Sequence, residues 1–387
     1  MTKNKTLLTI ALASLMGLAG CSVRGNSSVA GTSSVAGTST PASSVSSAVD
    51  IQDPYAAVLA GIDLTKATND TTEGAIANGY AEEGVAYGWI SYTAYGSGYG
   101  VAVKLTIADQ KITDIAIGAP ASNVHNFTPS YATGNGATAY ATYKANFLTN
   151  VKAAVKTKDP IIVANALKDA VADPTKGEYG TFTPADDYKF VGTGASQTDS
   201  RTNVAIYQAC KAYVIANEAS YDPFTTVFSA ITVDTATIPT TGVVNGNGFK
   251  DTTDNKIAYG YTIYNSHSSN YGAAVKITTD SASKITAVEL GLPLAGAHNF
   301  TPMYLGKAGF NAFIDYSLNI QKVVNTTFVG KTVDQAVTAI GTPAIDLTSQ
   351  YGTFTPSVDF VVTTGATQTD ARTGLAIFAA LNALKAA

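Results

Sequence analysis

An internal repeat constrains this chain more than any other feature of its sequence. The octapeptide Thr193–Ser200 (TGASQTDS) returns almost unchanged as Thr364–Ala371 (TGATQTDA). Other matched segments keep nearly the same separation: Tyr87-Gly88 with Tyr259-Gly260, His125–Pro129 (HNFTP) with His298–Pro302, and Tyr179–Pro184 (YGTFTP) with Tyr351–Pro356. Several motifs at one fixed separation predict two copies of one domain, which we place at residues 51–220 and 221–387.

The first 50 residues are typical of targeting and tethering rather than of a fold. Residues 1–20 predict a lipoprotein signal peptide, because Lys3 and Lys5 precede an apolar run, Leu7–Leu18, that is too short to span a membrane. Leu18-Ala-Gly-Cys21 resembles the bacterial lipobox, so we expect lipidation of Cys21 and a lipid anchor at the extracellular face of the cell membrane. The alternative is an ordinary cleaved signal with an incidental cysteine. Residues 21–50, rich in Ser, Thr and Ala, predict a disordered, flexible tether.

Composition argues against several classes of function. Cys210 is the one cysteine besides Cys21, so lipidation leaves no pair for an intrachain disulfide. Charged residues are 13% of the chain and the net charge is −4, which provides no basic stripe for nucleic acid. The sequence has no cysteine pair, no His-x-x-x-His and no calcium-loop spacing, so we predict no metal site. No Gly-x-Ser-x-Gly elbow suggests a hydrolase.

Each repeat predicts an antiparallel meander followed by helices, which is an α+β class. The expected strands are 86–94, 99–107 and 112–117 in the first repeat, and 258–264, 271–278 and 284–290 in the second. The expected helices are 140–156 and 161–172, then 308–326 and 332–340. An extended segment, 188–191 or 360–362, precedes each octapeptide, and an amphipathic helix follows it.

The octapeptide predicts a turn from a strand into a helix. Thr198-Asp199 and Thr369-Asp370 are suitable N-cap residues, and a helix N-terminus beside Gly-Ala favours an approaching anion such as phosphate. Arg201 and Arg372 follow in the first turn, where they could bind the anion. The alternatives are that the turn is only structural, and that each arginine is solvated or pairs with a nearby Asp.

The order of a glycine-rich Tyr strand, a hairpin with Lys-Ile-Thr, helices and then Thr-Gly-Ala-Ser/Thr-x-Thr resembles the FMN-binding domain of bacterial respiratory subunits, such as those of the Na+-translocating quinone reductase and the Rnf complex. In that family a flavin transferase esterifies the phosphate of FMN onto the Ser or Thr after Gly-Ala. The resemblance covers roughly residue 86 to the C-terminus, and implies two covalent FMN groups at Ser196 and Thr367. The remaining cofactor-binding residues that it implies in the motif are Thr193, Gly194, Ala195, Thr198 and Arg201, and Thr364, Gly365, Ala366, Thr369 and Arg372.

Two features depart from the family pattern. An Asp commonly lies a few residues before the Gly-Ala, but here the nearest acids are farther out, at Asp187 and Asp359. The first copy also carries Ser where Thr is more usual. Tandem copies behind a lipobox and a tether are nevertheless similar to the flavolipoproteins of the pheromone-lipoprotein type, which carry out extracellular electron transfer in Gram-positive bacteria.

The repeated His-Asn-Phe-Thr-Pro motif suits a flat heteroaromatic ring. Its phenylalanine could pack on the ring, its Asn and Thr could donate hydrogen bonds, and its His could stabilise a reduced, anionic flavin. A rigid structural loop is the alternative. The candidate residues are His125, Asn126, Phe127 and Thr128 in the first copy, and His298, Asn299, Phe300 and Thr301 in the second. The third histidine, His267, has no counterpart, and we expect it to be exposed.

These features predict a membrane-anchored electron carrier with two FMN groups. It would accept electrons from a membrane quinol or NADH dehydrogenase system and pass them to extracellular acceptors such as ferric iron. Such a chain is a carrier rather than a substrate-specific enzyme, although an assembled reductase with its own substrate stays open. The alternative from a different class is a surface-binding or adhesive lipoprotein with duplicated non-redox domains, for which the 21 tyrosines would supply recognition surfaces.

Overall fold

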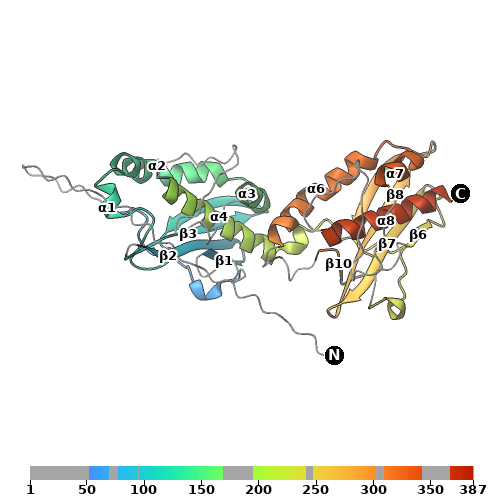
Figure 1. Cartoon of the computed structure of the whole chain (residues 1–387), viewed down its shortest axis with the longest axis horizontal. Coiled ribbons are helices and arrows are strands. Elements are labelled where there is room, and N and C mark those ends of the chain that lie inside the picture. The colour runs from blue at the N-terminus through green and yellow to red at the C-terminus, as the bar shows by residue number, and fades with distance from the viewer. Residues whose placement is uncertain are drawn as a thin grey trace, which may run out of the picture. The chain divides into compact units, whose positions relative to one another are not determined.

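The structure is a computed structural model that describes residues 52–68, 77–94, 96–168, 195–240, 247–300, 305, 309–341 and 367–386 (Figure 1). For residues 94, 196, 367 and 368 it describes the backbone alone. The chain folds as mixed α and β structure with two largely antiparallel sheets, which confirms the α+β class. The signal peptide, Cys21 and the tether lie outside the described residues, and the division at residue 220 stays a prediction.

The first repeat forms a five-stranded sheet. Its strands are β1 (Ala77–Glu82), β2 (Val85–Ala94), β3 (Ser97–Ala108), β4 (Lys111–Gly118) and β5 (Val124–His125). Strands β1 to β4 are antiparallel neighbours in chain order, and β5 runs parallel to β3. The β3–β4 turn closes on Asp109 and Gln110, both at positive φ, which is the backbone of a tight two-residue hairpin.

The second repeat forms a sheet with the same connections. Its strands are β6 (Asn247–Lys250), β7 (Ile257–Ser266), β8 (Ser269–Thr279), β9 (Ile285–Gly291) and β10 (Ala297–His298). Strand β8 pairs with β7 and β9 in antiparallel fashion and with β10 in parallel. His267 lies in the β7–β8 turn at positive φ and is exposed, as expected.

The three expected strands of each repeat are confirmed as β2 to β4 and β7 to β9, within three residues at each end. Strands β1 and β6 were not predicted. Their sequences, ANGYAE and NGFK, contain Gly, Asn and Ala, which have low strand propensity. They are strands because tertiary packing places them beside β2 and β7, under a helix.

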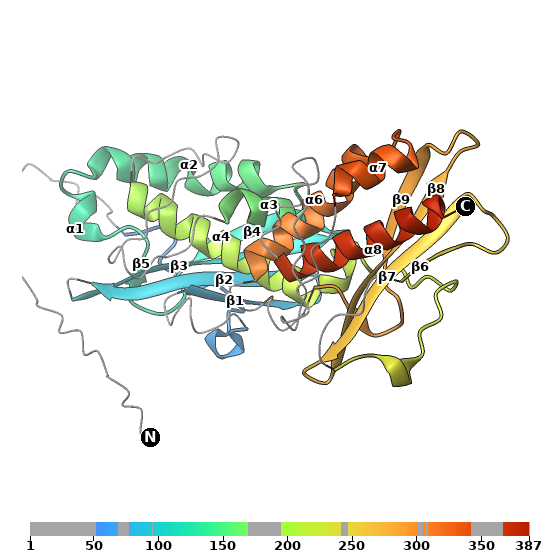
Figure 2. The same ribbon diagram turned by 45° about the vertical axis from the view of Figure 1, so that its right-hand side comes forward.

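Helices cover one face of each sheet (Figure 2). The helices of the first repeat are α1 (Pro129–Ala132), α2 (Ala137–Val155), α3 (Pro160–Leu167) and α4 (Ser196–Ala216), and those of the second are α6 (Phe310–Phe328), α7 (Val333–Ile340) and α8 (Thr367–Lys385). The expected helices are therefore confirmed, except that α3 ends at Leu167 and residues beyond 168 lie outside the described part. Asp159 caps α3, and Thr332 with Gln335 forms a capping box on α7. No described helix is long and apolar enough to cross a membrane.

A pair of glycines lets the last helix of each repeat press directly onto the sheet. Gly79 and Gly88 are cross-strand partners, as are Gly248 and Gly260. A Cβ atom on Gly88 would lie 2.1 Å from the carbonyl oxygen of Ala205 in α4, and one on Gly260 would lie 2.1 Å from that of Ala376 in α8. The repeated Tyr-Gly pair is thus explained, because only glycine permits so close an approach.

The opposite face of each sheet is covered by the segment that precedes it. In the first repeat this segment contains the 3-10 helix η1 (Leu64–Lys66), and Leu59 packs with Tyr80, Tyr87 and Trp89. The 3-10 helix η3 (Glu218–Ser220) follows α4, and the segment that precedes the second sheet contains η4 (Thr235–Thr237). There Phe228 and Ile231 pack with Tyr259. Alternation along β2 explains the division, since Ala86 and Ile90 lie in the helix-side core while Tyr87 and Trp89 face this segment.

Candidate functional site

The two candidate hydroxyl residues each occupy the first position of a long helix. Ser196 begins the 21-residue helix α4, and Thr367 begins the 19-residue helix α8. The prediction that Thr198-Asp199 and Thr369-Asp370 cap these helices is wrong, because both pairs lie inside the first turn. Ala195 is the N-cap of α4 and makes no side-chain hydrogen bond to it. Ala195 thus contributes no side-chain acceptor to the first amides of α4, and a helix start of this kind favours a bound anion.

Thr198 and Arg201 join the first turn of α4 to the loop after β5. The Thr198 hydroxyl donates to the main-chain carbonyl of Asn126 over 2.9 Å. The Arg201 guanidinium donates from Nε to Asn126 Oδ1 over 3.0 Å and from Nη2 to the Asn126 carbonyl. Asn126 Nδ2 donates in return to Thr202 Oγ1 over 3.2 Å. We call this set the Asn–Arg clamp, and it joins Thr198, which lies inside the first turn rather than at the N-cap, to a loop distant in sequence.

The same clamp recurs in the second repeat. Thr369 Oγ1 donates to the Asn299 carbonyl over 2.9 Å, and Arg372 donates from Nε to Asn299 Oδ1 over 3.0 Å and from Nη2 to the Asn299 carbonyl. Asn299 Nδ2 donates to Thr373 Oγ1 over 3.0 Å. The two motifs that the sequence analysis treated separately, the octapeptide and His-Asn-Phe-Thr-Pro, are therefore parts of one site.

Both clamp arginines are buried, with exposed fractions of 4% for Arg201 and 2% for Arg372. The alternative of a solvated arginine is therefore wrong, and the described partners are an asparagine, a threonine and a tyrosine rather than an Asp. Nη1 of Arg201 donates to the Tyr92 hydroxyl over 2.9 Å, and Nη1 of Arg372 to the Tyr264 hydroxyl over 2.8 Å. Binding of phosphate by either arginine stays a prediction.

A stacked tyrosine pair lies against each clamp arginine. Tyr92 and Tyr99 are cross-strand partners with ring centroids 5.8 Å apart, and Tyr264 and Tyr271 lie 5.4 Å apart. The guanidinium carbon of Arg201 lies 5.7 Å from the Tyr99 ring. The first pair is half-buried, whereas the second is buried. A cation beside aromatic faces is stabilised electrostatically, which offsets part of the cost of its burial.

A buried aspartate from the preceding segment holds the clamp loop of the first repeat. Asp53 Oδ2 accepts the backbone amides of Asn126 and Phe127 over 3.0 and 3.1 Å, and Asp53 Oδ1 accepts the Tyr143 hydroxyl over 2.8 Å. These bonds hold the loop whose carbonyl and side chain accept hydrogen bonds from Arg201. Side chains from four separate segments of the chain thus meet at the first turn of α4.

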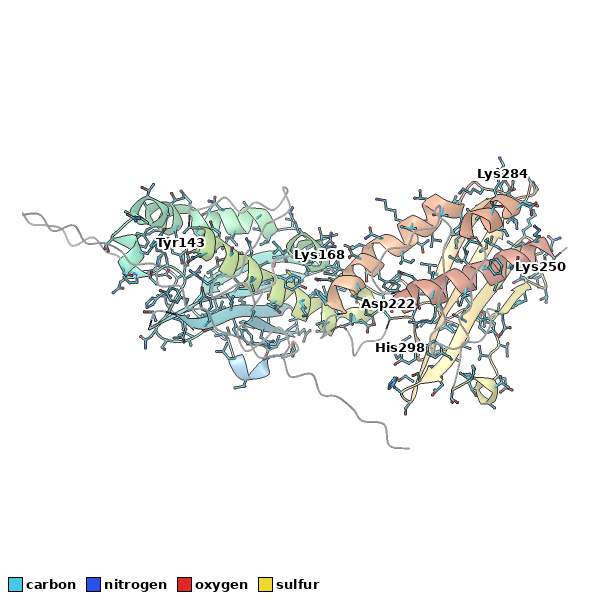
Figure 3. All side chains as sticks on the ribbon, in the orientation of Figure 1. Tyr143, Lys168, Asp222, Lys250, Lys284 and His298 are labelled. Carbon is cyan, nitrogen blue, oxygen red and sulfur yellow. The ribbon has the colours of Figure 1, made fainter. Side chains whose placement is uncertain are left out.

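Asp222 is the counterpart in the second repeat, but its contacts differ. Asp222 Oδ1 accepts the Phe224 amide over 2.8 Å and the Tyr316 hydroxyl over 3.2 Å, and it interacts electrostatically with His298 (Figure 3). Burial raises the pKa of Asp222, and the hydrogen bonds and His298 oppose that rise. Burial also raises the pKa of Tyr316 well above its usual value and lowers that of Arg372. These shifts follow from burial, because the exposed fractions of Tyr316 and Arg372 are 0% and 2%.

Of the remaining described residues of His-Asn-Phe-Thr-Pro, the phenylalanines lie in the core and the others are partly buried. Phe127 packs on Tyr140 and Tyr143, with centroids 5.3 and 5.2 Å away, and Phe300 packs 5.2 Å from Phe313. Their packing on a flavin ring stays a prediction. His125 and His298 are partly buried, and Thr128 precedes α1 without a side-chain capping bond.

Several candidate residues lie outside the described part of the chain. They are Thr193, Gly194, Thr301, Thr364, Gly365 and Ala366, together with the YGTFTP motifs and the extended segments before each octapeptide.

Sequence reasoning missed the aspartates, the tyrosines of α2 and α6, and the tyrosines that bind the arginines. A signal for the aspartates was present, because Asp53-Pro54-Tyr55 and Asp222-Pro223-Phe224 recur at nearly the repeat separation. In both copies the carboxylate accepts the amide two residues on, at Tyr55 and Phe224. No sequence pattern distinguished the tyrosines that bind the arginines from the other tyrosines, of which the chain has 21 in all.

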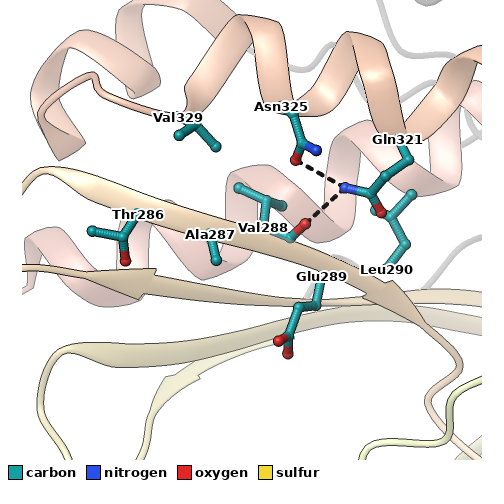
Figure 4. Close-up of a pocket in the computed structure, with 8 residues that line it drawn as sticks. All are labelled: Thr286, Ala287, Val288, Glu289, Leu290, Gln321, Asn325 and Val329. Atoms are coloured by element: carbon teal, nitrogen blue, oxygen red, sulfur yellow. Dashed lines mark hydrogen bonds between the residues drawn. The ribbon is translucent and has the colours of Figure 1, made fainter.

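A groove elsewhere in the second repeat lies between β9 and α6 (Figure 4). Its volume is about 430 Å³, and Gln321 spans it by donating to the Val288 carbonyl and to Asn325 Oδ1, each over 2.9 Å. At the matching place in the first repeat Lys152 and Asp114 form an ion pair of 2.9 Å. None of the groove residues belongs to the Asn–Arg clamp.

Comparison with known proteins gives no relative: the chain matches no family model, no curated protein and no solved structure.

Proposed function

We propose that this chain is a membrane-anchored flavoprotein that carries FMN covalently on Ser196 and Thr367 and relays electrons outside the cell. Its donor would be a membrane quinol or NADH dehydrogenase system, and its acceptors would include ferric iron. The observation that carries the proposal is the shared position of the two hydroxyl residues: each begins a long helix whose first turn is fixed by the same clamp.

The residues of this site fit a phosphate ester. The first turn of α4 presents backbone N–H groups, and Ala195 supplies no competing side-chain cap. The clamp keeps that turn in place, because Arg201 and Thr198 both bind the Asn126 carbonyl. Formation of the ester would join the hydroxyl oxygen to phosphorus and break the diphosphate bond of a flavin dinucleotide. FMN would stay on the protein, and the adenosine monophosphate half of the dinucleotide would leave together with the hydroxyl proton. The flavin transferase would catalyse this step.

The remaining contribution of the protein is electrostatic. Bound flavin supplies reversible one-electron and two-electron redox chemistry. The buried guanidinium groups of Arg201 and Arg372 place positive charge beside the first turns of α4 and α8, where it would stabilise a nearby anion. Attachment through an ester would retain the cofactor on a protein exposed to the extracellular medium, and an anchor through Cys21 would keep it near a membrane donor.

The test is the intact mass of protein produced with and without a flavin transferase. With the transferase we expect two added FMN groups, a yellow colour that persists after denaturation, and loss of one group in Ser196→Ala and one in Thr367→Ala. Ser200→Ala is the matched control, because it removes a hydroxyl from the same first turn at a position where the second copy has Ala371. Colourless protein under these conditions would reject the proposal and favour the surface-binding lipoprotein.

A further inference from the structure

Asn203 is a buried amide whose oxygen has no partner within the described part of the chain. It lies on α4 and its exposed fraction is 2%. Among the described residues, its Oδ1 is one of three buried side-chain polar atoms without a hydrogen bond, together with His125 Nδ1 and Ser317 Oγ. Buried polar groups in folded proteins are nearly always paired, because an unpaired one loses its bonds to water and gains nothing. An unpaired Asn in a helix core therefore calls for a physical reason.

The position of Asn203 relates it to the attachment residue. It lies seven residues after Ser196, which is two helical turns, so both residues lie on one face of α4 about 10 Å apart along the axis. Ala205 and Ala209 occupy the other side, where their backbone atoms contact Gly88 of the sheet. Position 203 thus lies on the same face of α4 as position 196, away from the Asn–Arg clamp.

The second repeat has no amide at this position. Thr202-Asn203-Val204 aligns with Thr373-Gly374-Leu375, and Gly374 is buried in the interior of α8. Neither residue is favoured by the helix itself, since Gly is the poorest helix former after Pro and Asn is also a weak one. The two copies therefore differ by one polar side chain on the face that follows the attachment residue.

We infer that the Asn203 amide is a binding residue for the flavin ring in the first repeat, and that the second repeat lacks this contact. The inference rests on the proposed function. A carboxamide has one acceptor and two donors side by side, and the pyrimidine edge of a flavin carries carbonyl acceptors beside an N–H donor. A ring bound there would satisfy the amide that the protein leaves unpaired. The first site then binds the ring more tightly than the second.

The test uses the full chain produced without flavin transferase, with riboflavin as the probe. Riboflavin has the ring but no phosphate, so it reports the ring contact without attachment. We expect Asn203→Leu to weaken riboflavin binding to the tighter site by about five- to tenfold, the size of one hydrogen bond. The urea midpoint of unfolding should stay the same or rise, because the substitution removes an unpaired polar group from the core.

Ser317→Ala is the matched control, because it removes another unpaired buried oxygen, on α6 of the second repeat. It should leave riboflavin affinity unchanged. A lower urea midpoint for Asn203→Leu, with riboflavin affinity unchanged, would overturn the inference and give Asn203 a purely structural role. Absence of riboflavin binding to the unsubstituted protein would also overturn it. Neither result bears on the added FMN mass, which tests the proposed function separately.

Discussion

Replacement of Gly88 by alanine tests how closely α4 packs on the first sheet. The added Cβ would lie 2.1 Å from the Ala205 carbonyl oxygen, 2.4 Å from the Ala209 backbone nitrogen and 3.0 Å from the Ala209 Cβ. The two closest atoms belong to the helix backbone, so no side-chain rotation can relieve the clash. The helix must move away by roughly 1 Å, in a core that is as densely packed as an organic crystal.

The expected cost follows from two opposing terms. Overpacking of this kind destabilises a protein by about 1–3 kcal/mol and at times more. The loss of backbone freedom in the unfolded chain returns about 0.4–1 kcal/mol. Because the clash here is with backbone, we expect Gly88→Ala to lower the free energy of unfolding by about 2 kcal/mol, in the upper part of the net range.

The measurement is urea unfolding followed by circular dichroism, with two comparison variants. Gly134→Ala adds a Cβ whose nearest neighbour, the Ser130 carbonyl oxygen, is 3.7 Å away, so its midpoint should barely change. Adding Ala209→Gly to Gly88→Ala should restore little, because the backbone contacts remain. A Gly88→Ala protein as stable as the unsubstituted chain would refute the packing argument, and full rescue by Ala209→Gly would show that the side chain was the obstacle.

Two predictions concern the clamp and its aspartate. Arg372→Lys should lower the free energy of unfolding by about 2–4 kcal/mol. An ammonium group cannot reach Asn299 and Tyr264 together, so the substitution would leave buried acceptors unpaired. A urea unfolding curve that matches that of the unsubstituted chain would contradict this. The pKa of Asp222 is raised in the folded protein above the unfolded pKa of an Asp, near 3.8. The protonated Asp222 therefore contributes its full stability below pH 3.8, and this contribution is lost as the pH rises through the folded pKa. Relative to the unsubstituted chain, Asp222→Asn should therefore gain stability as the pH rises above the unfolded pKa of an Asp, near 3.8, and a difference in stability that does not change with pH in thermal unfolding would contradict this.

Periodicity and repetition made much of the fold predictable. Alternating apolar residues located β2, β3 and β4, and the copy in the second repeat located β7, β8 and β9 with the same accuracy. Strands β1 and β6 escaped because their propensity is low and a neighbouring helix determines their conformation. The start of α4 likewise depends on tertiary contacts, since Thr198 lies inside the first turn and its hydroxyl donates to the Asn126 carbonyl of a loop distant in sequence.

The candidate site was predictable in its motifs but not in their connection. The octapeptide and the His-Asn-Phe-Thr-Pro motif are more than 60 residues apart in sequence, and only the fold brings Arg201 to Asn126. The partners of the arginines were not predictable for the same reason: their acceptors are main-chain, amide and tyrosine hydroxyl oxygens, which no local pattern reveals. Ser196 and Thr367 at helix starts agree with the expected turn into a helix.

The two aspartates also govern where this chain can be cut. Asp222 follows only six residues after the end of α4, yet its bond to Tyr316 places it inside the second repeat. A fragment of the second repeat that starts at Thr225 or later would lose this carboxylate and leave the Tyr316 hydroxyl without its acceptor. Separate production of the halves should therefore divide the chain between Tyr221, whose hydroxyl donates to Asp159 of the first repeat, and Asp222. A first half should retain Asp53, which accepts the Tyr143 hydroxyl.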